Sequence, residues 1–442
     1  MKLRLSSYFL LFAAFWGATL FAQDAAPEKW DLKQCIEHGL ANHPLLKIAE
    51  NTVENRQASL QQSRAYWDPK LDMRASWNRR RNDSGGSLDD LVDSTSESVG
   101  LSKVLLDSGQ NRYDRLNAEN SLKAAAFSRE NTRIEIASGI KKAFFVAQQA
   151  QALVQVREET LDGYQKHLEK VEGYVEVGTR APYDITRARV DVANAQVELI
   201  SARSRLKVAR ANLARAVGLE GELDVADFEI SSVPSTSAAK EELKDKAFAR
   251  PELVAASYDI ESANARVKGL KKSLQPVVSA SADYSWNGTI TPLNRQWSAG
   301  VSVNWPVFDG RLTKSRVDAA RSQLESTRES YRNLKLIVSA ELENAITGFE
   351  DALERFRATE MLVQQASESM YLAEGRYDAG LGNPIEINDA RVEYTRARGN
   401  NVVAYFDSLI AIAELERVAG DLPVEYRIQP IDKPEEKEEQ QK

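Results

Sequence analysis

Residues 276–308 read PVVSASADYSWNGTITPLNRQWSAGVSVNWPVF, and this stretch decides the fold. Apolar residues alternate with polar ones in two runs, whose apolar members are Val278, Ala280, Ala282, Tyr284 and Trp286, then Trp297, Ala299, Val301, Val303 and Trp305. A sustained period of two predicts β-strands with one apolar and one polar face. We expect these strands at about 276–287 and 296–307, with the polar segment Asn287–Gln296 as the loop between them.

A similar pair of strands is expected earlier in the chain. Leu71, Met73, Ala75 and Trp77 alternate with polar residues and predict a strand at about 69–79. A second strand is expected at about 97–106, although Lys103 interrupts its apolar face. The segment Arg79–Ser96 is polar and contains glycine, so we expect it to be a loop.

These strands have the length of transmembrane β-strands, and Trp and Tyr stand at the ends of their apolar faces, as in an aromatic girdle. Two ordinary soluble hairpins are the alternative. Four strands cannot close a membrane barrel, and an open edge in lipid costs several kcal/mol for each unsatisfied backbone group. A barrel reading therefore predicts that several chains share it, and three copies would supply twelve strands, an even number in the usual range.

The chain contains an internal repeat. Pro44 and Pro69 match Pro251 and Pro276 at an offset of 207 residues, and Gly218 matches Gly420 at an offset of 202. The tips 177–182 and 379–384 also match at 202. We predict a first repeat at 23–220, a linker at 221–240 and a second repeat at 241–420.

Each repeat also predicts a long helical hairpin. From Gln110 to Val177 the chain lacks proline, which allows a helix of about 100 Å. Its heptad positions are apolar, namely Ile140, Ala147, Val154, Leu161, Leu168 and Val175. The returning helix carries alanine every seventh residue from Ala188 to Ala216, whereas the second copy places Asn401 and Ser408 in its core rows, so the two hairpins are not expected to be equivalent. A coiled-coil rod is the alternative, but rods rarely insert strand pairs between their helices.

The two ends of the chain look unlike the repeats. Lys2 and Arg4 precede an uncharged run from Leu5 to Leu20, which predicts a cleavable signal peptide at 1–22, with a retained anchor as the alternative. Residues 421–442 are expected to be an acidic C-terminal tail.

Composition excludes several classes of function. The net charge is −7 and no basic block stands out, so no nucleic-acid partner is expected. Cys35 cannot form an intramolecular disulfide, and the three histidines show no metal-ligand spacing. No catalytic triad or phosphate loop is present, so we expect no enzyme, no metal and no cofactor.

Taken together, the repeat and its motifs resemble the outer-membrane efflux family of TolC-like ducts over essentially the whole mature chain. The resemblance includes Asp107-Ser108-Gly109 and Phe308-Asp309-Gly310, where strand passes to helix, and the tips Val177-Gly178-Thr179 and Ala379-Gly380-Leu381. It implies a mainly α protein with a transmembrane β-barrel, in which a homotrimer forms a twelve-stranded barrel in outer-membrane lipid and a twelve-helix periplasmic tunnel.

The resemblance also implies a function and partners. Such ducts connect to a periplasmic adaptor protein and an inner-membrane transporter, and they export small molecules or, in type I secretion, proteins. The alternative from another class is a secreted periplasmic coiled-coil scaffold or adhesin.

The family's functional residues can be placed on this chain by position. The adaptor-docking tips would be Val177, Gly178, Thr179, Ala379, Gly380 and Leu381. The periplasmic aperture would involve Glu386 and Asp389 as an acidic ring, with Tyr183, Asp184, Tyr377 and Arg180 as closing residues. Acids at a helix start are also favoured by the helix dipole alone. Gly382 stands where the best-known member has an arginine, and Arg180 occupies the corresponding place on the other hairpin, so the tie between chains is expected to be swapped or missing.

Overall fold

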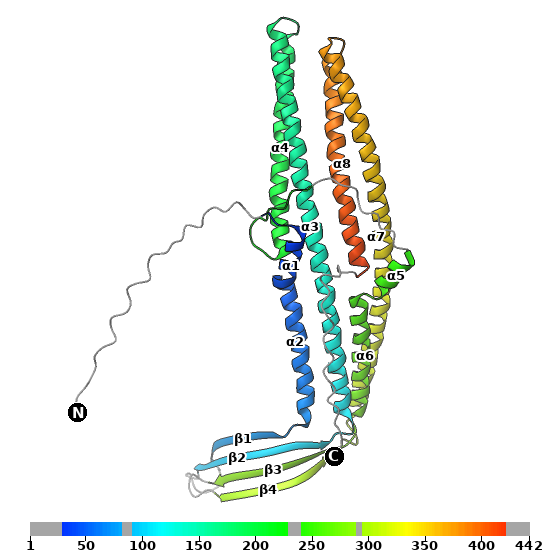
Figure 1. Cartoon of the computed structure of the whole chain (residues 1–442). Coiled ribbons are helices and arrows are strands. Elements are labelled where there is room, and N and C mark those ends of the chain that lie inside the picture. The colour runs from blue at the N-terminus through cyan, green and yellow to red at the C-terminus, as the bar shows by residue number, and fades with distance from the viewer. Residues whose placement is uncertain (1–28, 82–90, 229–239, 289–293, 421–442) are drawn as a thin grey trace, which may run out of the picture.

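The computed structural model describes residues 29–81, 91–228, 240–288 and 294–420. The expected signal peptide at 1–22, the tail at 421–442 and most of the linker at 221–240 lie outside these ranges. The described chain is mostly helical, with one small antiparallel sheet at the end of the long helices opposite the hairpin tips (Figure 1).

The elements follow the same order twice. A short helix α1 (Leu32–Asn42) and a 3-10 turn (Ala65–Trp67) accompany the first copy, and α5 (Lys240–Phe248) precedes the second. The copies are α2 (Pro44–Arg64), β1 (Lys70–Arg81), β2 (Leu91–Leu106), α3 (Gln110–Glu176) and α4 (Pro182–Val217), then α6 (Pro251–Lys272), β3 (Val277–Gly288), β4 (Asn294–Asn304), α7 (Leu312–Asp378) and α8 (Pro384–Val418).

The long helices of the two copies match residue for residue. α3 and α7 each contain 67 residues, and both of their ends differ by 202 in number. Each begins at a corner with two consecutive left-handed residues, Ser108 and Gly109 in one and Gly310 and Arg311 in the other. An aspartate stabilises each corner, because Asp107 and Asp309 accept hydrogen bonds from the backbone N–H four residues later, at 2.6 and 2.7 Å.

The four strands form one antiparallel sheet in the order β1-β2-β3-β4. Its register places Met73, Val99, Tyr284 and Trp297 side by side, so apolar residues dominate one face. The strands extend further than the hydrophobic pattern predicted: β1 runs to Arg81 and β2 begins at Leu91, so Arg79–Ser96 is not all loop. Arg79 binds Asp93 through two bonds of 2.7 and 2.9 Å, and this pair supports the ladder beyond the apolar residues.

The two helical hairpins have different cores. The α3–α4 hairpin packs with α1 around a large apolar cluster that includes Ile36, Ile140, Leu213 and Val217. The alanines of α4 from Ala188 to Ala209 are buried against α3, which allows the close helix approach that their spacing predicted. The base of the α7–α8 hairpin has a smaller cluster and relies on charged residues as well.

Candidate functional site

The hairpin tips are built by the same local geometry in both copies. Gly178 and Gly380 each adopt a positive φ, 77° and 74°, directly after the long helix ends. The N–H groups of Thr179 and Leu381 then return to carbonyls five residues earlier, at 2.9 Å in each case. The returning helices start at Pro182 and Pro384, where the missing N–H has no cost.

The tips expose apolar side chains. Val177 and Leu381 are among the most exposed hydrophobic residues of the described chain, and Tyr183 is also exposed at the start of α4. Uncovered apolar groups at the end of a long rod are costly in water and suit contact with another protein.

Gly382 is required by the conformation of the second tip. A Cβ atom at this position would lie 2.8 Å from the backbone nitrogen of Tyr377 and 3.0 Å from the carbonyl carbon of Arg376. A side chain therefore does not fit unless the backbone moves. The backbone of this tip thus suits glycine at the position where the resemblance pointed to an arginine in another member.

The two hairpins meet at Tyr377, near the end of α7. Its side chain is buried, with the ring centre 5.6 Å from that of His167 and 6.4 Å from that of Tyr174. The guanidinium of Arg180 lies 4.6 Å from the centre of the Tyr377 ring. Arg180 belongs to the first tip and Tyr377 to the second hairpin, so this contact joins the two hairpins within one chain.

A second contact between the hairpins lies about one helical turn from His167 along α3. Arg391 of α8 is buried, donates to the carbonyl of Gly163 at 3.3 Å and lies over the ring of Tyr164. Burial lowers the pKa of His167 to about 4, and the positive charges of Arg391 and Lys170 add to this effect. Burial and these neighbouring charges therefore favour the neutral form of His167. The local sequence does not reveal a role for His167, because Tyr377 and Arg391 come from a distant part of the chain.

The predicted acidic residues form a separate group. Glu386 and Asp389 line an open groove of about 710 Å³ between α7 and α8, together with Glu368 and Glu393. Arg376 also lines this groove and lies 3.3 Å from Glu386. Asp184 instead lines a small cavity with His167 and Tyr377. Within one chain, Glu386 and Asp389 therefore line a different hollow from Tyr377, whereas Asp184 lies beside Tyr377.

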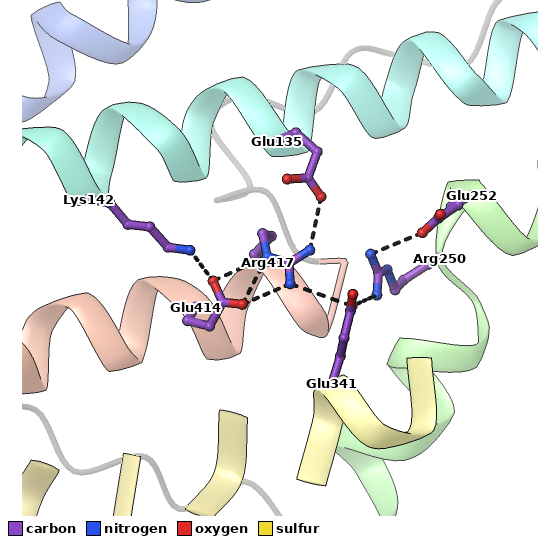
Figure 2. Close-up of polar contacts among 7 residues, drawn as sticks. All are labelled: Glu135, Lys142, Arg250, Glu252, Glu341, Glu414 and Arg417. Carbon is purple, nitrogen blue, oxygen red and sulfur yellow. Dashed lines mark hydrogen bonds and ion pairs between the residues drawn. The ribbon is translucent and has the colours of Figure 1, made fainter. Parts of the chain in front are cut away.

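A charged joint anchors the base of the second hairpin (Figure 2). Arg417 of α8 binds Glu135 of α3 at 2.9 Å, Glu414 at 2.7 Å and Glu341 of α7 at 3.5 Å. Glu341 also accepts a 2.8 Å bond from Arg250, whose side chain is only 3% exposed and which binds Glu252. Lys142 of α3 completes the joint by binding Glu414.

The joint has a strong electrostatic effect on its members. Burial acts to raise the pKa of Glu414, but hydrogen bonds from Arg417 and Lys142 outweigh it and hold this pKa at about 2. The same bond raises the pKa of Arg417. The first repeat has no such joint, because His43, Gly139 and Asn212 occupy the places of Arg250, Glu341 and Glu414.

No three His, Cys, Asp or Glu side chains in the described ranges are grouped so that they could hold a metal ion. Among the helices that the structure describes, none is long and apolar enough to cross a membrane.

Comparison with known proteins gives a consistent result. The family model described as "Outer membrane efflux protein" matches residues 35–219 and 246–421. The probable efflux pump outer membrane protein TtgC of Pseudomonas putida is 24% identical over 378 residues, which cover 81% of this chain and 76% of that protein.

Solved structures share the fold. The outer membrane protein VceC of Vibrio cholerae is similar with a TM-score of 0.73 and 21% identity, covering 88% of this chain and 96% of that one. The Campylobacter jejuni CmeC outer membrane channel is similar with a TM-score of 0.76 and 16% identity, covering 88% and 85%.

Proposed function

The chain belongs to the outer membrane efflux protein family and is therefore a protein of the bacterial outer membrane, and from this premise we propose that three copies form an exit duct through that membrane. The duct conducts passively and carries out no reaction, in keeping with a family of channel proteins. Its strands form a shared barrel, and its helices continue this barrel as a tunnel in the periplasm.

The sheet is the observation that carries this proposal. Leu71, Met73, Trp297 and Val301 are all exposed on its apolar face, which would be unfavourable in water. Among the described residues, β1 and β4 each have a strand neighbour on one side only. Lipid would cover the apolar face, and pairing with strands of other copies would satisfy the free edges of β1 and β4. Three copies of four strands would give a barrel of twelve strands.

The hairpin tips support the proposed partners. Val177, Gly178, Thr179, Ala379, Gly380 and Leu381 would dock a periplasmic adaptor, which in turn would connect an inner-membrane transporter. The exposed Val177 and Leu381 would supply apolar contacts. Relatives such as TtgC are named as efflux pump components, so we propose export of small molecules, with protein export as the second possibility.

The aperture is proposed at the same end of the molecule. Glu386 and Asp389 of three copies would bring six carboxylates together and favour cations. Tyr183, Asp184, Arg180 and Tyr377 would hold the hairpins in the closed arrangement. A secreted coiled-coil scaffold or adhesin is less well supported, because it leaves the exposed face of the sheet without an occupant.

Single-channel conductance in a planar bilayer tests the proposal. We expect the purified wild-type protein to give a small, cation-selective current that multivalent cations block. In Glu386→Gln/Asp389→Asn, the blockade should weaken and the cation preference should fall. The matched control is Glu97→Gln, because Glu97 lies between Ala75 and Trp286 on the outward face of the sheet. It removes charge without changing the lumen.

The outcomes separate the parts of the proposal. A protein that remains dispersed without detergent and gives no current would overturn the duct. A current that responds equally to the Glu386/Asp389 and Glu97 variants would keep the duct but exclude the acidic ring as its narrowest point.

A further inference from the structure

A groove separates the two returning helices of the chain. α4 and α8 both pack against α3 but only slightly against each other, and the two hairpins stand side by side (Figure 1). The space between them has a volume of about 540 Å³ and is lined by residues of all three helices. Small-molecule sites in proteins occupy about 300–1,000 Å³. The groove therefore has room for one small organic molecule.

Contacts between the hairpins bound this groove at both ends. At the end nearer the tips, Arg391 of α8 donates to the carbonyl of Gly163 and lies over the ring of Tyr164, which also lines the groove. Toward the base, Gln149 of α3 donates to the carbonyl of Val403 at 3.3 Å, and Val403 is the last lining residue on α8. The separation of the helices is thus set by the fold itself.

Gly399 of α8 leaves part of the groove open. Beyond its own turn of helix, a Cβ atom at this position would meet no heavy atom within 4 Å, so no close helix packing requires the glycine. Glycine inside a helix is less favourable than alanine by about 1 kcal/mol. The equivalent position on α4, 202 residues earlier, is Val197. The second copy therefore has a less stable helix at this point and more room in the groove.

The lining is more basic than the chain as a whole, whose net charge is −7. Its charged members are three arginines and two acids, namely Arg157, Arg205, Arg396, Asp191 and Glu198. Arg205 is exposed and forms no ion pair within the described ranges. Arg157 approaches Glu198 only to 3.9 Å, which is too far for a hydrogen bond. Both guanidinium groups thus keep N–H donors that suit an anion.

The two arginines and Gly399 come together at one level of the groove. Two ion pairs to α3 fix this level, Glu158–Arg203 from α4 at 2.8 Å and Glu159–Arg398 from α8. Arg157, Arg205 and Gly399 each lie within two positions of a member of these pairs. Leu153 and Val403 line the groove about one turn further along α3 and α8, where they add an apolar surface. A basic group of side chains thus adjoins an apolar one.

We propose that the groove between α4 and α8 binds a small amphipathic anion, whose charged group lies at Arg157 and Arg205 and whose apolar part lies against Leu153 and Val403. This inference goes beyond the proposed function, because a site formed within one chain needs neither the barrel nor the docking partners. A molecule bound here touches both hairpins and holds them at their present separation.

Calorimetric titration of the full-length protein in lipid nanodiscs tests the charge preference of the site. The anionic probe is naphthalene sulfonate, its neutral analogue is naphthalene sulfonamide, and empty nanodiscs correct for binding to lipid. We expect the sulfonamide to bind about fivefold more weakly than the sulfonate, as one exposed charge contact predicts. Arg205→Gln should weaken sulfonate binding by a similar factor and leave sulfonamide binding unchanged.

A substitution that fills the groove tests its position. Gly399→Leu places a side chain in the open space, so binding of both probes should fall by about tenfold or more. The matched control is Gly348→Leu, because a Cβ atom there also meets open space but lies on α7, outside the groove. This control should leave both affinities unchanged.

The outcomes separate this site from the proposed duct. Sulfonate binding that survives Gly399→Leu would overturn the site, and so would equal losses in the Gly399 and Gly348 variants. Equal affinity for the two probes would overturn the preference for an anion. A wild-type protein that conducts in a planar bilayer but binds neither probe would overturn the site and leave the proposed duct intact.

Discussion

Arg180 of the first hairpin lies with its guanidinium 4.6 Å from the centre of the Tyr377 ring of the second hairpin, so one hairpin of the chain holds the other. The hydroxyl of Tyr377 is buried and has no hydrogen-bond partner among the described residues. The contact therefore depends on the face of the ring and on the cation above it.

Loss of this cation should favour the open state. A partly buried cation–π contact contributes about 1 kcal/mol, so Arg180→Gln should raise the ratio of open to closed channels about fivefold. Arg180→Lys should retain most of the closure. Tyr377→Phe should behave like the wild type, whereas Tyr377→Leu should resemble Arg180→Gln. Single-channel open probability measures these differences, and an open Tyr377→Phe channel would show that the hydroxyl has a partner across the chain boundary.

A side chain at Gly382 should disturb the second tip. Gly382→Ala places a methyl group against the backbone at Tyr377, so we expect a local loss of about 1–3 kcal/mol. Hydrogen exchange of residues 378–386 should accelerate. Gly375→Ala is the control, because a Cβ atom there meets open space within α7, and alanine should stabilise the helix by about 1 kcal/mol. Equal exchange in both variants would contradict the steric account.

The charged joint should contribute strongly to stability. Arg250 is buried, whereas Glu341 is about a third exposed and keeps Arg417 at 3.5 Å, so Arg250→Met should lower the free energy of unfolding by about 1–2 kcal/mol. Arg328→Met removes an exposed pair with Glu325 and should change it by less than about 0.5 kcal/mol. Chemical denaturation followed by circular dichroism compares the two. Similar effects for both variants would mean that burial of Arg250 adds nothing.

Acidification should weaken the contact between the hairpins through His167. The pKa of this side chain is lowered to about 4 in the fold from an ordinary value of 6.5. The unfolded chain therefore binds more protons in this window, so stability falls as the pH drops from about 6.5 toward about 4. His167→Gln should remove this part of the pH dependence. Melting temperatures of both proteins across this range provide the measurement, and parallel curves would contradict it.

The local elements were largely predictable from the sequence. Glycines and prolines at fixed offsets indicated the repeat, because turns and helix ends require these residues at particular backbone positions. In the structure, α3 and α7 have equal lengths. Alternation indicated the strands wherever one face is apolar. Alternation failed in the first part of β2, where residues 93–98 are all polar and pairing depends on the partner strand.

The candidate site was harder to predict from the sequence, because its contacts join residues that are far apart in the chain. Arg180 and Tyr377 could be named by family position, but their mutual contact depends on how the hairpins lean together. His167, Arg391 and Arg376 were missed because nothing in their local sequence marks them. The role of Gly382 required the backbone of the tip itself, since only there does a Cβ atom approach Tyr377.

The charged joint lies far from the tip of α7, so a small rotation at the joint corresponds to a large displacement at the tip. Glu341 lies 37 residues before the end of this unbroken helix at Asp378, which corresponds to about 55 Å of rigid length. A rotation of about 10° at the joint would sweep the tip through about 10 Å, while atoms near Glu341 would move very little. A small rearrangement of Arg250, Glu341 and Arg417 would therefore be amplified into a large displacement at the far end of the second hairpin.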